Sequence, residues 1–355
     1  MRTPLSLQTD HAPDRRLFLH HALRTTAAAG ALLLGGCALR PDTAMTDSRT
    51  FSPLPTSPLA DHPMHPTQLP LSGWLDWEDP RSGHTWRVWL QMPEFPAPPE
   101  GYPALVVMDG NAIFPLAAQW ARLQQTRPVY VRGEPCVIIG IGHPGDALFH
   151  SDSRKRDFTP PAPDVKPPEG GADVLLDFLQ NVLLADWMAR IPLNPQRLGL
   201  YGHSLSGLFV LHALFTRPAL FTDYYAVSPS IWWHDAWLLQ EQAHFIASQP
   251  NHYRQGADQR ANVFLYAGSL EEPSGERPAN APPTGQRHTV RLQITRTREM
   301  AQQLQALQWP QLQSSFHLWP DLTHGDTMMP SLMQAVGNMS MPKAWKDADY
   351  GLRRE

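Results

Sequence analysis

The chain has 355 residues, of which 42% are hydrophobic and 17% are charged, and its formal net charge is −4. This apolar share is enough for a large core and is too high for a mainly disordered chain. The 29 Lys and Arg do not outnumber the 33 Asp and Glu, so no positive excess is available to neutralise phosphates and a nucleic-acid partner is not expected. The 37 prolines, about one residue in ten, predict long ordered loops.

Residues 1–36 have the pattern of an export signal. Arg15 and Arg16 form a twin-arginine pair, and a small apolar stretch follows at 27–34. That stretch is much shorter than the roughly 20 residues needed to span a bilayer. Cys37 follows a Leu-Gly-Gly sequence, as the lipidated cysteine of a bacterial lipobox does. We therefore expect a periplasmic protein anchored to a membrane through Cys37; the alternative is an ordinary cleaved signal with a chance cysteine.

The rest of the chain divides into three parts. Residues 37–70 are rich in Pro, Ser, Thr and Asp without a hydrophobic period, which predicts a disordered tether. Residues 71–342 have the alternating apolar patterns of one large domain. Residues 343–355 form a C-terminal tail.

In chain order, short apolar runs alternate with longer helical patterns. Strands are predicted at 86–92, 104–108, 137–141, 198–201, 225–228, 263–267 and 314–319. Helices are predicted at 114–125, 173–190, 205–216, 234–247 and 290–307, and polar or proline-rich loops at 93–103, 151–168 and 273–283. Strands separated by such helices imply an α/β fold with a mostly parallel central sheet and helices on both faces.

The most specific motif lies at 198–207, Leu-Gly-Leu-Tyr-Gly-His-Ser-Leu-Ser-Gly. A strand runs into Gly-x-Ser-x-small-Gly and then into a helix, the pattern of a nucleophile elbow. Gly202 allows the close passage of backbones, and Ser206, in place of the usual Gly, is still small. Ser204 is therefore the expected nucleophile, and the backbone N–H of Leu205 is an expected oxyanion donor. The alternative is a tight structural turn.

The general base should follow the nucleophile in the chain, because this fold orders its site as Ser, acid, His. His324 lies in the loop directly after the last predicted strand, at the edge of the sheet where ligands bind. His212 lies eight residues into the elbow helix and His317 within a strand, which makes both less suitable. We expect His324 to be the base; otherwise it is a surface histidine.

Two adjacent carboxylates, Glu271 and Glu272, follow the strand at 263–267. Either can orient the base and stabilise its cation. We prefer Glu271, with Glu272 or Asp235 as alternatives. A solvated loop role for Glu271, with a Ser-His dyad, is equally open.

The second oxyanion donor should come from the turn after an early strand. Asn111 follows the apolar strand at 104–108, and its backbone N–H is well placed for this role. Asp109 precedes it and is expected to be a structural hydrogen-bonding residue of the turn.

The sequence predicts no cofactor and no metal. Gly140 to Gly145 matches Gly-x-Gly-x-x-Gly, but Pro144 and a polar loop follow where a dinucleotide site needs a helix. The chain has no Walker motif and no His-Glu-x-x-His. His62 and His65 lie in the tether.

Five segments resemble one known family, the enterochelin-esterase-like (siderophore esterase) branch of the α/β-hydrolase esterases. They are 108–114, 156–160, 170–173, 202–218 and 228–233, in this order. The resemblance covers about residues 70–340. It implies an α/β-hydrolase fold, serine-dependent ester hydrolysis, and relatives that cleave the trilactone backbone of catecholate siderophores, some of them in the periplasm. By position it also implies Ser204 as nucleophile, His324 as base, and Asn111 and Leu205 as oxyanion donors.

The substrate is less defined. Trp232 and Trp233 follow the strand after the elbow and either line a pocket or pack a helix onto the sheet. Arg156, with its neighbours Arg154 and Lys155, either binds an anionic substrate or is solvated. We expect a serine esterase acting on a small-molecule ester, extending to siderophore trilactones. The alternatives are acyl transfer on the same fold and a non-catalytic siderophore-binding protein.

Overall fold

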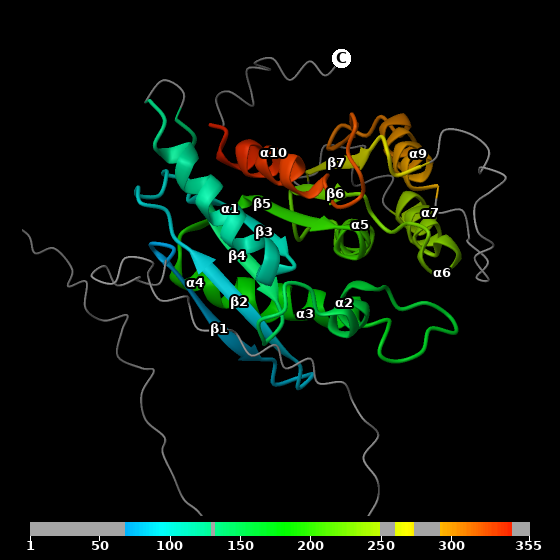
Figure 1. Ribbon diagram of the computed structural model, residues 1–355, viewed down its shortest axis with the longest axis horizontal. Helices are drawn as coiled ribbons and strands as arrows, with labels where there is room; N and C mark the ends of the chain where they lie inside the picture. Colours follow the sequence, from blue (N-terminus) through cyan, green and yellow to red (C-terminus); the bar gives the residue numbers. More distant parts are fainter. Residues whose placement is uncertain (1–67, 129–131, 249–259, 273–291, 343–355) are drawn as a thin grey trace, which may run out of the picture. The chain divides into compact units, whose positions relative to one another are not determined.

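A computed structural model describes residues 68–128, 132–248, 260–272 and 292–342, which all belong to one compact unit. Within them, eight strands form one sheet in the order β1-β2-β4-β3-β5-β6-β7-β8 (Figure 1). The strands are β1 Ser72–Glu78, β2 Thr85–Gln91, β3 Tyr102–Met108, β4 Val137–Gly142, β5 Leu193–His203, β6 Asp223–Val227, β7 Ala261–Gly268 and β8 Leu312–Trp319. β2 pairs antiparallel with β1 and β4, and the remaining pairs are parallel.

The helices lie mainly between the strands in the sequence. They are α1 Gly110–Gln125, α2 Ser151–Phe158, α3 Ala172–Phe178, the π-helical turn η2 Leu179–Leu183, α4 Leu184–Arg190, α5 Leu205–Thr216, α6 Trp233–Ala236, α7 Leu238–Ser248, α9 Gln293–Ala306 and α10 Met328–Ser340. α5 has the predicted bounds, because an unbroken apolar sequence follows the elbow.

Successive residues of β3 face opposite layers, as the pleat requires. Ala104, Val106 and Met108 belong to the larger core, which includes buried side chains of α3, α4, α5, α7 and α9. Leu105 and Val107 belong to a second core with α1 and α10 (Figure 1). Buried Cys136, which precedes β4, also lies in this second layer. The prediction of a mostly parallel sheet with helices on both faces is therefore confirmed.

Three elements differ from the sequence predictions. Residues 151–158 form α2 rather than a loop; only Asp157 and Phe158 of this helix are buried, so no apolar period marks it. β1 was not predicted because most of its residues are exposed at the sheet edge. α10 was also not predicted; its Pro330 lies in the first helical turn, where proline is tolerated.

Two predicted helices are interrupted. The helix expected at 173–190 contains η2 in its middle, and the helix expected at 234–247 is divided because His234 and Asp235 have left-handed backbone angles. Residues 1–36, Cys37, nearly all of 37–70, the loop at 273–283 and the tail at 343–355 lie outside the described residues. Among the helices that are described, none has the length and apolar content to cross a membrane.

Candidate active site

Ser204 lies in a strained turn between β5 and α5, with φ 61° and ψ −113°. The turn is tight enough that a Cβ on Gly202 would meet the backbone carbonyl of Ser206, and one on Gly207 would lie 2.9 Å from the carbonyl oxygen of Val227. The backbone N–H of Ser204 donates to that same Val227 oxygen at 2.9 Å. The small residues of the motif are thus required by packing, and they expose the Ser204 hydroxyl at the carboxyl end of the sheet.

His324 lies in the turn after β8, and its Nε2 is 2.9 Å from Ser204 Oγ. Its Nδ1 is 2.6 Å from Oε2 of Glu271. A carboxylate only accepts hydrogen bonds, so Nδ1 carries the imidazole proton and Nε2 is free to accept the Ser204 proton. The structure therefore brings the three predicted residues into one hydrogen-bonded chain.

Both carboxylate oxygens of Glu271 accept hydrogen bonds. Its side chain is 1% exposed, and Oε1 accepts hydrogen bonds from Ser228 Oγ and from the N–H of Gly268, both at 2.6 Å. Burial alone would raise the pKa of Glu271, but the hydrogen bonds from His324, Ser228 and Gly268 together lower it below its usual value. The carboxylate is therefore ionised at neutral pH.

The two alternative acids lie elsewhere. Glu272 accepts hydrogen bonds from the N–H of Thr295 at 2.9 Å and from its hydroxyl at 2.7 Å, at the start of α9. Asp235 is exposed in the turn of α6. Of the three carboxylates, Glu271 is the one bonded to His324.

Three residues at the site were not identified from the sequence. The hydroxyl oxygens of Ser228 and Thr327 lie 3.0 Å apart, and Thr327 donates to the His324 carbonyl oxygen at 2.9 Å. His203, next to Ser204, is buried and bonds through Nε2 to the same carbonyl oxygen at 2.7 Å. Two sequence signals could have pointed to these supports: the histidine before the serine, and Ser228 at the start of the segment 228–233.

The predicted oxyanion donors begin two helices. Leu205 is the first residue of α5 and Asn111 the second of α1, and first-turn N–H groups have no partner within their helix. Two hydrogen bonds to the backbone of His143 fix the Asn111 side chain. Its Oδ1 accepts the His143 N–H at 3.0 Å, and its Nδ2 donates to the His143 carbonyl oxygen at 3.0 Å. Its amide group also donates to Gly145 O at 3.2 Å, so the side chain is committed to the loop after β4.

The predicted substrate-binding residues are partly engaged in the protein itself. Trp233 is buried and donates its indole N–H to Glu169 at 3.2 Å, while Trp232 is half-buried against the larger core. Arg156 donates to both carboxylate oxygens of Asp157, at 2.6 and 2.9 Å. Its neighbour Arg154 pairs with Asp109 at 2.7 Å. Contact of these residues with a substrate stays a prediction.

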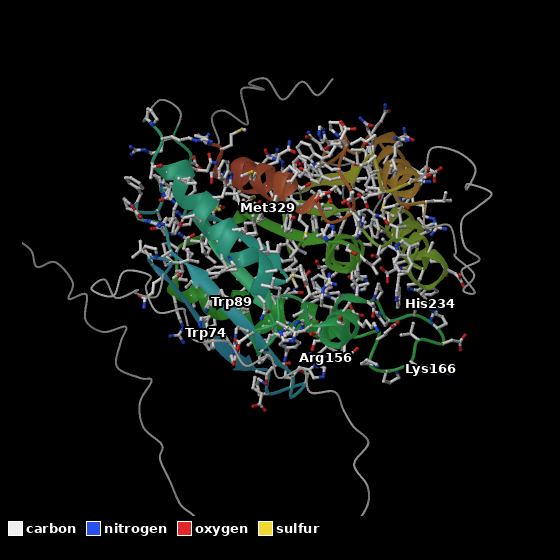
Figure 2. All side chains as sticks on the ribbon, in the orientation of Figure 1. Trp74, Trp89, Arg156, Lys166, His234 and Met329 are labelled. Atoms are coloured by element: carbon white, nitrogen blue, oxygen red, sulfur yellow. The ribbon has the colours of Figure 1, made fainter. Side chains whose placement is uncertain are left out.

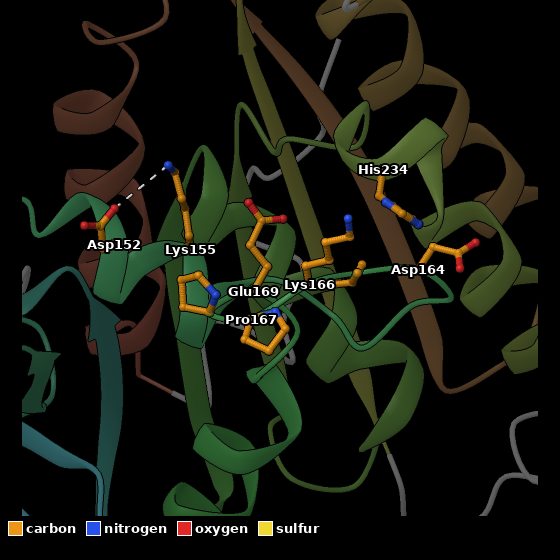
Figure 3. A pocket seen from close by; sticks show the side chains of 9 residues that line it. Asp152, Lys155, Asp164, Lys166, Pro167, Glu169 and His234 are labelled. Carbon is orange, nitrogen blue, oxygen red and sulfur yellow. Dashed lines mark ion pairs between the residues drawn. The ribbon is translucent and has the colours of Figure 1, made fainter.

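A cavity of about 410 Å³ lies between α2, the loop at 164–169 and the turn at His234 (Figure 3). Lys155, Glu169 and Lys166 extend in the same direction beside it, and Lys155 lies 4.0 Å from Asp152 (Figure 3). Figure 2 shows Lys166 and His234 on the same side of the molecule. Lys166 lines this cavity together with Asp164 and Glu169.

The glycine pattern at 140–145 does not begin a helix, since β4 ends at Gly142 and α2 starts only at Ser151. A dinucleotide site of the type that this pattern marks requires a helix there. Across the described ranges, no three His, Cys, Asp or Glu side chains gather as a metal site would need.

Comparison with known proteins indicates the family to which the chain belongs. The family model described as "Putative esterase" matches residues 80–322. The ferri-bacillibactin esterase BesA of Bacillus subtilis (strain 168) is 34% identical over 198 residues, 53% of this chain and 66% of that protein, just under two thirds of its length. The siderophore triacetylfusarinine C esterase of Aspergillus fumigatus is 34% identical over 233 residues, 64% of this chain and 73% of that protein.

Solved structures have the same fold. The BES protein from Bacillus cereus superposes with a TM-score of 0.67 at 26% identity, covering 79% of this chain and 100% of that chain. Siderophore hydrolase EstB from Aspergillus nidulans gives a TM-score of 0.64 at 27% identity, covering 82% and 99%. The chain therefore belongs to this esterase family of α/β-hydrolase fold, a family of carboxylic-ester hydrolases, in its enterochelin-esterase-like branch.

Proposed function

We propose that the protein is a serine esterase in which Ser204, His324 and Glu271 form the catalytic triad. The observation that carries the proposal is the continuous hydrogen-bonded chain from Ser204 Oγ through both ring nitrogens of His324 to Glu271. This is the arrangement that nucleophilic catalysis by serine requires: a nucleophile in contact with a base, and a base oriented by a third group.

In the first half-reaction, His324 Nε2 takes the hydroxyl proton as Ser204 Oγ bonds to the ester carbonyl carbon. The carbonyl electron pair moves onto its oxygen, which the N–H groups of Leu205 and Asn111 stabilise. The tetrahedral intermediate then collapses, and the alcohol leaves with the proton from His324. Water repeats the sequence on the acyl-enzyme and releases the acid.

Glu271 supports both proton transfers. It keeps the His324 proton on Nδ1, and its negative charge stabilises the imidazolium that forms when Nε2 is protonated. The hydrogen bonds from Ser228 and Gly268 hold this carboxylate in place and ionised. The imidazole therefore needs little reorganisation during the reaction.

We propose siderophore esters as the substrate class. The curated relatives bear the names of siderophore esterases, and the cavity beside α2 has the volume typical of a small-molecule site. His234, which lines this cavity, is four residues after Ser230 in the chain, and Ser230 Oγ is 3.4 Å from Ser204 Oγ. Exposed Phe149, 5.3 Å from the Arg154 guanidinium, offers an aromatic surface for such a substrate.

The test compares wild type with Ser204→Ala on p-nitrophenyl acetate, p-nitrophenyl butyrate and a catecholate trilactone. We expect the wild type to hydrolyse all three and Ser204→Ala to lose at least a thousandfold in kcat. Absence of any activity above that of the variant would remove the catalytic proposal. Hydrolysis of the aryl esters alone would remove catecholate trilactones from the proposed substrates.

The contribution of the cavity is tested separately with Lys166→Gln. We expect KM for the trilactone to rise about fivefold or more while KM for p-nitrophenyl acetate stays unchanged. Arg190→Gln is the matched control, since Arg190 is an exposed cation on α4 that pairs with Asp186. An equal effect of both variants on KM would show that the cavity does not bind the substrate.

We also propose export and lipid anchoring, supported by the twin-arginine pair and by the Leu-Gly-Gly sequence before Cys37. Wild type should fractionate with membranes, Cys37→Ser should be exported but released in soluble form, and replacing Arg15 and Arg16 together by Lys should leave the precursor in the cytoplasm. A Cys37→Ser variant that still fractionates with membranes would exclude the anchor.

A further inference from the structure

A buried hydrogen bond connects the elbow to the turn after β3. Ser206 Oγ donates to Asp109 Oδ2 at 2.7 Å, and both side chains are buried. Ser206 directly follows Leu205, and Asp109 lies two residues before Asn111. The bond therefore joins the two segments whose N–H groups are the proposed oxyanion donors.

The Ser206 hydroxyl has a single proton, and two acceptors lie within reach. The carboxylate of Asp109 is the stronger acceptor and, at 2.7 Å, is nearer than the His203 carbonyl oxygen at 2.9 Å. The hydroxyl oxygen in turn accepts the backbone N–H of His203 at 2.9 Å. The chain of bonds thus runs from the residue before Ser204, through Ser206, to the turn that carries Asn111.

Arg154 of α2 completes the contact. Its Nε donates to Asp109 Oδ1 at 2.7 Å and its terminal nitrogen to Oδ2 at 3.2 Å, with the His203 carbonyl at 3.5 Å. The guanidinium compensates the buried charge of Asp109, which would otherwise be costly to remove from water. We call Asp109, Ser206 and Arg154 the elbow bridge.

Two features distinguish the elbow bridge from an ordinary elbow turn. The elbow motif usually has Gly where Ser206 stands, and a glycine could not make this bond. Asp109 has φ 55°, in the left-handed region, directly before α1. Such a conformation persists in a non-glycine residue when its surroundings fix it, and the bonds to Ser206 and Arg154 do so.

We propose that Ser206 and Asp109 are positioning residues that fix the separation between the N–H groups of Leu205 and Asn111, and so set how strongly the site stabilises the oxyanion. The proposal rests on the proposed function, since it needs that pair of donors. A single oxyanion donor contributes about a hundredfold to a thousandfold in kcat, and it does so only when it is pre-oriented. Loosening the bridge should therefore weaken binding of the transition state and spare binding of the ester.

The experiment measures kcat and KM for p-nitrophenyl acetate, together with inhibition by two matched ketones. A trifluoromethyl ketone forms an oxyanion with the active-site serine, whereas the corresponding methyl ketone represents the ground state. For Ser206→Ala we expect kcat to fall about tenfold with KM within twofold. The trifluoromethyl ketone should lose about tenfold in affinity and the methyl ketone none.

Ser206→Cys keeps a weak donor at nearly the same size and should recover part of the lost kcat, which a role in packing alone would not predict. Thr297→Val is the matched control, because it removes another fully buried hydroxyl, bonded to Gln293 O in α9. This control should lower stability and leave the ratio of the two ketone affinities unchanged.

The outcomes separate the two proposals. If wild type is no more active than Ser204→Ala, the proposed function fails and the bridge with it. If wild type is active but Ser206→Ala leaves kcat unchanged, or weakens both ketones equally, the positioning role is wrong. Should Ser206→Ala not fold, Arg154→Gln tests the same bridge from its partly exposed end. A selective loss of about threefold for the trifluoromethyl ketone supports the proposal, and no selective loss overturns it.

Discussion

His203 donates its Nε2–H to the backbone carbonyl oxygen of His324 at 2.7 Å, and the two imidazole rings lie 4.6 Å apart. The residue before the proposed nucleophile thus holds the loop that carries the proposed base. Burial lowers the pKa of His203 to about 3, and the nearby His324 contributes in the same direction. His203 is therefore neutral at physiological pH and serves as a fixed hydrogen-bond donor.

Replacing His203 by Phe removes this donor, so the His324 loop should become less ordered. We expect kcat to fall about tenfold, with His203→Gln in between because its amide can still donate. Steady-state kinetics on p-nitrophenyl acetate check this. Equal kcat values for His203→Phe and wild type would show that the bond has no part in catalysis.

The same residue affects stability in acid. The pKa of His203 is about 3 in the folded protein and about 6.5 in the unfolded chain. As the pH falls from about 6.5 toward 3, the unfolded chain binds the proton and the folded protein does not, so the free energy of unfolding decreases. His203→Gln should therefore lose less stability than wild type between pH 6.5 and pH 4. Urea midpoints across this range measure the difference, and parallel curves for the two proteins would contradict the assignment.

His212 is expected to show the opposite dependence. Burial alone would lower its pKa, but hydrogen bonds to Asp173 and Glu241, at 3.3 and 2.8 Å, raise it to about 8. Arg217 also lies 3.7 Å from Asp173. Because the folded protein binds the proton more tightly, the stabilisation is complete below about pH 6.5 and is lost as pH rises through 8.

Urea unfolding of His212→Gln at pH 6 and pH 9 tests this. The free energy of unfolding should differ from wild type by about 1–2 kcal/mol more at pH 6 than at pH 9, as a pKa rise of this size implies. Thr297→Val, which removes no titratable group, provides the control. A His212→Gln deficit independent of pH would mean that His212 is neutral in the folded protein.

The adjacent glutamates form a matched pair. Glu271→Gln keeps the shape of the side chain but no longer holds the His324 proton on Nδ1, so we expect kcat to fall at least a hundredfold. Glu272→Gln should stay within threefold of wild type in kcat and lose some stability, since Glu272 bonds Thr295 at the start of α9. A loss well under tenfold for Glu271→Gln would favour a Ser-His dyad.

Two glycines differ in what a methyl group would meet. At Gly202 a Cβ would collide with the Ser206 backbone, whereas at Gly337, inside α10, it meets nothing within 4 Å. Gly202→Ala should destabilise by about 1–3 kcal/mol or prevent folding. Gly337→Ala should stabilise by about 0.5–1 kcal/mol, because glycine is a poor helix former. Thermal unfolding of both variants tests these two changes in stability: the midpoint should fall for Gly202→Ala and rise for Gly337→Ala.

Much of the fold could be predicted because it depends on local pattern. The apolar runs of β3 and β4 and the uninterrupted apolar sequence of α5 are unambiguous. The missed elements lack such a pattern: β1 is exposed over most of its length, and α2 is mainly charged. These two are held by neighbours in space, through pairing with β2 and through the Arg154–Asp109 contact.

At the proposed site, motif and chain order predict Ser204 and His324, whereas the sequence offers only a preference for Glu271 over Glu272 and Asp235. That choice depends on the turn after β7, where the Gly268 N–H bonds the Glu271 carboxylate and the following residue turns toward α9. Asp109 and Ser206 of the elbow bridge are 97 residues apart in the chain, so no local sequence pattern predicts the bond between them.

The thiol of Cys136 is 1% exposed in the layer formed with α1 and α10. Cys37 is the only other cysteine of the chain, and a lipid thioether at its sulfur would leave Cys136 as the sole free sulfhydryl. A thiol-reactive dye would then label the mature protein only when this layer opens. Labelling of Cys136 can be followed with and without an inhibitor bound at Ser204. The difference in labelling rate would measure how a ligand at the carboxyl end of the sheet changes the rate at which α1 and α10 separate from it.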